Sequence, residues 1–72
     1  MRLKNIREDR GWSVRALATR AGMSYTYVSN VENGKVDPSL SALKRLAEAL
    51  GVTVSKLVQE PGTRARKQSY GG

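Results

Sequence analysis

Apolar residues recur along the chain at the three- and four-residue spacing of helices that bury one face. No stretch alternates apolar and polar residues with period two over a useful length, so nothing in the pattern indicates a sheet. The connections between the periodic segments are short, which favours a compact all-α fold, a five-helix bundle. The helices are predicted at about Arg2–Arg10, Val14–Ala21, Tyr25–Asn33, Leu40–Leu50 and Val54–Gln59.

The gaps between these segments carry residues that end one helix and begin the next. A glycine, which enters the left-handed conformation without steric cost, follows each of the first four segments: Gly11, Gly22, Gly34 and Gly51. A hydroxyl residue suited to the N-cap precedes each later segment: Ser13, Ser24, Ser39 and Thr53. Three caps also lie within apolar pairs at the spacing of a hydrophobic staple: Trp12 with Leu17, Met23 with Val28, and Val52 with Leu57.

Composition limits the chain to one small domain without covalent or metal supports. The 72 residues include no Cys, no His and no Phe, so the core must be built from Leu, Val, Ile and Ala. The predicted domain spans residues 1–60. From Pro61 the apolar periodicity stops, and we expect residues 61–72 to be a disordered basic tail, a linker, or the beginning of a longer chain.

The charge favours a polyanionic partner. Lys and Arg number 13 against 6 Asp and Glu, which gives a formal net charge of +7. Nucleic acid is the first partner that such a balance indicates, an anionic membrane surface the second, and a merely soluble basic surface the remaining alternative. No apolar run approaches the ~20 residues of a membrane span, and no signal peptide is recognised, so we expect a cytoplasmic, nucleoid-associated protein without membrane contact.

Enzymatic chemistry lacks its usual components in this sequence. Without His, Cys or a Gly-rich phosphate loop, nucleophilic and metal-assisted reactions have no evident residues. We therefore predict a protein that is not an enzyme, with no catalytic residues, metal or cofactor. A core this small also offers no evident pocket for a small-molecule ligand.

The most informative stretch is residues 14–33, where two short predicted helices are joined by Gly22-Met23-Ser24. A glycine-containing turn of three to four residues between two helices is the signature of a helix-turn-helix. Ala18 must be small where the second helix crosses it. The seam between the helices is expected to consist of Leu17, Ala21, Val28 and Val31. An ordinary αα-hairpin is the alternative, although it does not require this combined spacing.

These residues resemble the phage-repressor, or XRE-like (Cro/CI-type), helix-turn-helix family over Leu3–Val58. The matching positions in the motif are Ser13, Leu17-Ala18, Ala21-Gly22-Met23-Ser24 and Val28-Ser29-Asn30-Val31-Glu32-Asn33-Gly34-Lys35. Those downstream are Pro38-Ser39-Leu40, Leu43, Leu46-Ala47 and Ala49-Leu50-Gly51-Val52. The resemblance implies a lambda-repressor-like domain whose third helix enters the major groove of double-stranded DNA. It also implies a sequence-specific transcriptional regulator, expected to be a repressor.

The third predicted helix has the length and the surface for base reading. Tyr25–Glu32 makes about 12 Å of helix, comparable with the ~12 Å width of the major groove. Its expected base-reading residues are Tyr25, Thr26, Ser29 and Asn30. The Asn30 amide suits adenine N6 and N7, whereas Thr26 offers a hydroxyl or a methyl group. Tyr27 lies on the flank, where it either contacts a phosphate or packs on the preceding helix.

Phosphate contacts are expected on both sides of this helix. The candidates are Ser13, Val14, Arg15, Tyr27, Asn33, Lys35 and Lys44. The family often has Gln at the position of Val14, which contributes only its main-chain N–H here. Arg2, Arg20 and Arg45 are expected to be solvated. The resemblance also pairs Arg7 of the first helix with Glu32 in a structural salt bridge, while a phosphate contact is the alternative for Arg7.

Two copies are expected to act together on DNA. One recognition helix reads too few base pairs to select a site in a genome, whereas a symmetric homodimer reads a palindromic operator. Lys56 and Val58, near the surface of the last helix, are the predicted interface. The competing function is a protein-binding module of the same fold, such as an antitoxin subunit or a coactivator segment. The basic side of the motif favours DNA over that alternative.

Overall fold

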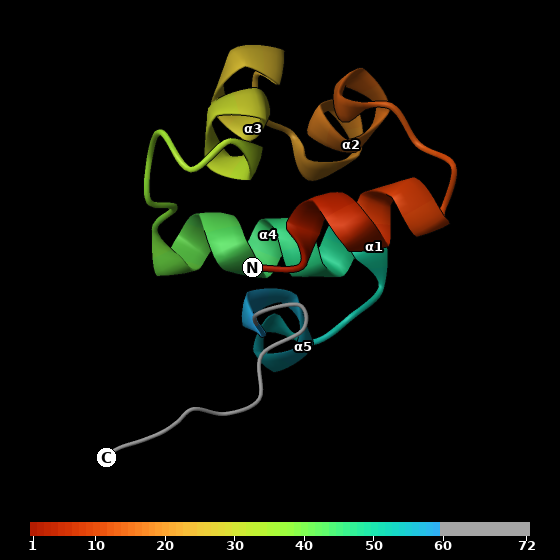
Figure 1. Cartoon of the computed structure of the whole chain (residues 1–72), viewed down its shortest axis with the longest axis vertical. Helices are drawn as coiled ribbons and strands as arrows, with labels where there is room; N and C mark the ends of the chain where they lie inside the picture. Colours follow the sequence, from red (N-terminus) through yellow and green to blue (C-terminus); the bar gives the residue numbers. More distant parts are fainter. Residues whose placement is uncertain (60–72) are drawn as a thin grey trace.

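The computed structural model describes residues 1–59, which form five helices and no strand, so the predicted all-α fold is confirmed (Figure 1). The helices are α1 (Leu3–Asp9), α2 (Val14–Ala21), α3 (Tyr25–Glu32), α4 (Leu40–Leu50) and α5 (Val54–Val58). Each boundary agrees with the sequence-based range to within one residue. The predicted tail, residues 61–72, lies outside the described residues.

The helices stack in three tiers around α4 (Figure 1). The first tier is the pair α2 and α3, in which α2 packs on both α3 and α4. The middle tier is α4 with α1, and α5 lies beyond it, in contact with both. The amide of Arg2 donates to the carbonyl of Leu57 at 2.8 Å, which ties the start of the chain to α5. None of the helices formed by residues 1–59 is long and apolar enough to span a bilayer.

The core is continuous through all five helices and consists of aliphatic side chains. Its largest fully buried members are Leu3, Leu17, Leu46, Leu50, Leu57 and Val28. Trp12, Met23 and Val52, the residues predicted to begin the hydrophobic staples, are partly buried against this core. Leu40 departs from the apolar pattern, since it is 61% exposed although it follows the helical spacing of α4.

Local capping explains why the helices begin and end where they do. The side-chain oxygens of the four predicted caps accept a bond from the amide three residues ahead, at 3.0–3.1 Å: Ser13, Ser24, Ser39 and Thr53. The four glycines have φ between 69° and 74°. Gly22 has a second constraint, because a Cβ there would lie 2.6 Å from Nη2 of Arg45. A larger residue at position 22 would therefore strain the backbone and displace that arginine.

Of the three arginines expected to be solvated, Arg20 and Arg45 are exposed as expected, whereas Arg2 is partly buried, which corrects the expectation for Arg2. Arg45 donates to the carbonyl of Gly22 at 3.1 Å. The guanidinium of Arg20 lies over the Trp12 ring, 4.2 Å from its centroid. Arg2 is partly buried, with its Nε enclosed and not hydrogen-bonded. Arg20 and Arg45 nevertheless remain exposed, because long side chains pack their stems and planes on the protein while their charge stays in water.

Candidate nucleic-acid interface

The turn between α2 and α3 fixes how the two helices cross. Gly22 adopts φ 69° at the end of α2, and the amide of Met23 donates back to the carbonyl of Ala18 at 2.9 Å. Ser24 then caps α3. Leu17 and Val28 are fully buried where the helices meet. Because of this packing, one side of α3 faces the core and its other side faces outward (Figure 1).

The outward side of α3 carries the side chains predicted to read bases. Tyr25 is 48% exposed and Thr26 is also exposed, whereas Ser29 and Asn30 are partly buried. The hydroxyl of Ser29 accepts a long, 3.5 Å bond from Nδ2 of Asn33. Tyr27 is partly buried against the core, so its ring takes the packing position that was one of its two expected roles.

Two helix starts lie beside this surface. Within residues 1–59, the cap on α2 occupies the amide of Ala16, and no hydrogen bond engages the amides of Val14 and Arg15. At the start of α3 the cap occupies the amide of Tyr27. Unengaged amides at a helix start attract anions, because the helix dipole adds to their partial positive charge. Val14 itself is partly buried, with its side chain against the core.

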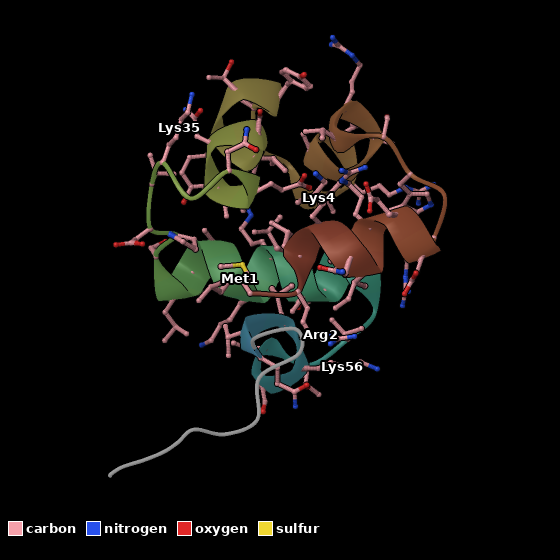
Figure 2. All side chains as sticks on the ribbon, viewed as in Figure 1. Met1, Arg2, Lys4, Lys35 and Lys56 are labelled. Atoms are coloured by element: carbon pink, nitrogen blue, oxygen red, sulfur yellow. The ribbon has the colours of Figure 1, made fainter. Side chains whose placement is uncertain are left out.

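The loop after α3 adds a basic, exposed edge. Asn33 is the C-cap of α3, Gly34 adopts φ 74°, and the amide of Lys35 donates to the carbonyl of Asn30 at 2.9 Å. Figure 2 shows Lys35 at the outer edge of this loop, next to the end of α3. Lys44 is exposed on α4. The loop thus places an ammonium group beside the polar surface of α3.

A buried ion pair holds the far end of α3. Arg7 Nε donates to Glu32 Oε2 at 2.6 Å and Nη2 donates to Oε1 at 3.0 Å, the two-pronged geometry that suits guanidinium and carboxylate. The side chains are 10% and 4% exposed. Nη1 also donates to the carbonyl of Trp12 at 2.6 Å. The hydrogen bonds that Arg7 donates to Glu32 raise the pKa of Arg7 above its already strongly basic value.

Through these three bonds, Arg7 joins segments that lie far apart in the chain. It belongs to α1, Glu32 is the last residue of α3, and Trp12 directly precedes the cap of α2. The structure therefore brings this predicted pair together and adds the Trp12 carbonyl, which the sequence did not indicate. One guanidinium fixes the end of α3 relative to the start of α2.

A second contact between the predicted residues was not foreseen. The guanidinium of Arg15, on the first turn of α2, lies over the ring of Tyr25, with its carbon 5.2 Å from the ring centroid. Sequence spacing gives no signal for this contact, because its partners come from different helices. It joins an expected phosphate contact to an expected base reader.

The predicted dimer residues lie on the opposite side of the molecule from α3. Leu57 of α5 is fully buried, while Val58 is 42% exposed and Lys56 is exposed. Figure 2 shows Lys56 on α5, in the tier farthest from α3. Val36 and Leu40, in and after the loop that follows α3, are further large apolar side chains with exposed surface.

Comparison with known proteins gives matches over nearly all of the described part. A family model described as helix-turn-helix matches residues 3–57. The immunity repressor protein of Bacillus phage phi105 is 41% identical over 59 residues, which cover 82% of this chain and 41% of that protein. The transcriptional regulator DdrOP3 of Deinococcus deserti is 38% identical over 58 residues, covering 81% and 45%.

Solved structures agree with these matches. The N-terminal DNA-binding domain of SinR from Bacillus subtilis superposes with a TM-score of 0.78 at 32% identity, covering 86% of this chain and 91% of that one. The hypothetical transcription factor NHTF from Neisseria gives a TM-score of 0.78 at 37% identity, covering 82% of this chain and 66% of that one. This chain spans less than half of the length of the two regulators matched by sequence.

Proposed function

Since the chain belongs to the helix-turn-helix family, we propose that it binds double-stranded DNA sequence-specifically and represses transcription. The similar proteins named above are transcriptional regulators and a repressor rather than enzymes. The observation that carries the proposal is the outward side of α3, where polar side chains lie between the starts of α2 and α3 and the basic loop at Lys35. This arrangement offers base-reading groups flanked by anion-binding groups.

In this proposal α3 lies in the major groove and its outward side chains contact base edges. Asn30 donates to N7 and accepts from N6 of adenine, and Thr26 contacts a base through its hydroxyl or methyl group. Tyr25 and Ser29 border the same surface. The partial burial of Asn30 and Ser29 supports a reading role, because a side chain held by its neighbours loses less conformational entropy on binding.

Phosphate contacts then fix the position of α3 along the groove. The start of α2 supplies the hydroxyl of Ser13 and the amide of Val14 to one strand. On the other side of α3, Asn33, Lys35 and Lys44 are placed to contact the backbone. The hydroxyl of Tyr27 is a further candidate, since partial burial of its ring leaves the polar end available.

The regulator acts as a homodimer on a palindromic operator, with α5 at the contact. Two α3 helices related by a two-fold axis read half-sites about 34 Å apart. Exposed Val58 and the stem of Lys56 offer a small apolar patch away from α3. A patch this small favours weak association in solution and cooperative binding on DNA.

Anisotropy titrations of a random-sequence duplex against salt test the DNA-binding proposal. The log of the binding constant should fall with log salt by about 0.9 for each neutralised phosphate. Lys35→Ala should reduce the magnitude of that slope by about 0.9, the contribution of one phosphate contact. Arg10→Ala is the charge-matched control, since this exposed arginine has no proposed contact with DNA or with a second copy, so its loss should leave the slope unchanged. A binding constant that does not change with salt concentration would favour the protein-binding module instead.

A further inference from the structure

We propose that Arg15 reads a guanine, with the ring of Tyr25 holding its guanidinium in the reading orientation. This inference rests on the proposed DNA-binding function and assigns Arg15 to a base edge rather than to a phosphate. It starts from the one ring contact that joins α2 to α3 within residues 1–59.

The position of the pair places it at the edge of the proposed interface. Arg15 is the second residue of α2 and Tyr25 the first of α3, so both side chains leave from helix starts. The guanidinium carbon lies 5.2 Å from the ring centroid, within the ~6 Å range of a cation–π contact. Tyr25 remains 48% exposed and Arg15 is exposed, so the pair is accessible to a large partner.

The side-chain donors of Arg15 are unengaged, unlike those of Arg7 and Arg45. Arg7 donates to Glu32 and Trp12, and Arg45 donates to Gly22. Among residues 1–59, the side chain of Arg15 has neither a hydrogen bond nor an ion pair, only the contact with the Tyr25 ring. Arg20 also lies over a ring and makes no side-chain hydrogen bond within residues 1–59, but it belongs to the last turn of α2, and its partner Trp12 is not part of α3.

A guanidinium held over a ring suits a base better than a phosphate. The Tyr25 ring limits where the Arg15 guanidinium can lie, and no acceptor within residues 1–59 engages its N–H donors. Two parallel donors at that edge match O6 and N7 of guanine, the commonest specific contact of arginine in the major groove. A phosphate contact requires charge and reach but no fixed plane, and lysine can supply both. The contact with Tyr25 restricts the guanidinium, and bidentate base reading needs that restriction whereas a single charge contact to phosphate does not.

Site selection from a random duplex pool, followed by affinity measurements on single-base variants, tests this assignment. The parent should select one guanine per half-site whose replacement weakens binding about 5- to 150-fold. Arg15→Lys keeps the charge but loses the paired donors, so it should lose most of that preference. Tyr25→Phe keeps the ring and should retain the preference, whereas Tyr25→Leu should reduce it. Arg20→Lys is the control and should change no position.

Three results would overturn the assignment. If Arg15→Lys keeps the guanine preference, the contact is to phosphate. If Tyr25→Phe loses it, the tyrosine hydroxyl is the reader. If the parent selects no such guanine, no base is read there. Random-duplex affinity separates this inference from the proposed function: salt-dependent binding by the parent with any of these results refutes only the role of Arg15, whereas no salt-dependent binding refutes both.

Discussion

Removing the carboxylate of Glu32 should destabilise the domain strongly. Glu32→Ala leaves the Arg7 guanidinium, 10% exposed, with only the Trp12 carbonyl in place of three acceptor bonds. Breaking a buried pair by removing one partner costs about 3–5 kcal/mol. At 0.05–0.15 kcal/mol per residue, the 59 described residues have roughly 3–9 kcal/mol of total stability. One substitution therefore removes a third or more of it.

Urea denaturation followed by circular dichroism measures this loss, with Tm as a second readout. At ~4–8 °C per kcal/mol for a domain of this size, Glu32→Ala should lower Tm by roughly 12–40 °C. The double variant Arg7→Met/Glu32→Leu removes both charges, so its stability should return towards that of the parent. It should not exceed the parent by much, because the Trp12 carbonyl loses its donor, at a cost of ~1–3 kcal/mol if water cannot replace it.

The control is Glu48→Ala, which removes an exposed carboxylate from α4 and should change stability by no more than ~0.5 kcal/mol. If Glu32→Ala is as stable as Glu48→Ala, the pair is a surface contact in solution and the reasoning fails. A double variant as unstable as Glu32→Ala would show that packing, not a stranded charge, sets the loss.

Three further outcomes follow. Asn30→Ala should weaken binding by ~1–3 kcal/mol at one base position and relax the base preference there, whereas Lys35→Ala should weaken binding to all sequences alike. If Asn30→Ala leaves the selected site unchanged, the base-reading surface lies elsewhere. Val58→Asp should abolish cooperative gel shifts on a palindromic site while Ser55→Asp does not, and one-to-one binding of the parent to a full palindrome would refute the dimer. Because the pKa of Arg7 is raised, the stabilisation from its charged form is fully present below the unfolded pKa and is lost only as pH rises through the higher folded pKa. The stability difference between the parent and Glu32→Ala should therefore stay constant from about pH 6 to 9, and a difference that shrinks in this range would contradict the reasoning.

The helix boundaries could be predicted because their determinants are local. A hydroxyl that caps the amide three residues ahead, or a glycine at positive φ, acts within one turn, so Ser24 and Gly22 specify the turn of the motif wherever it lies in the fold. The packing of Leu17 against Val28 follows from the same spacing, since both lie on the apolar sides of adjacent helices. The core and the outward side of α3 were predictable for this reason.

Contacts between side chains of different helices could not be predicted in this way. The contact of Arg15 with the Tyr25 ring, and the bond from Arg45 to Gly22, depend on how α2 crosses α3 and α4. Periodicity also failed for Leu40: it indicates which side of a helix is apolar, but not how far neighbouring helices extend along it. Leu40, the first residue of α4, therefore remains 61% exposed.

The central claim, that DNA lies against α2 and α3 with α3 in the groove, is tested most directly by amide chemical shifts of the labelled protein during titration with a short duplex. The largest changes should cluster at residues 13–15, 25–30 and 33–35, while amides of α5 stay unchanged on a duplex too short for two copies. Changes that cluster on α5, or at Thr19, Arg45 and Glu48 on the α2–α4 side, would contradict it.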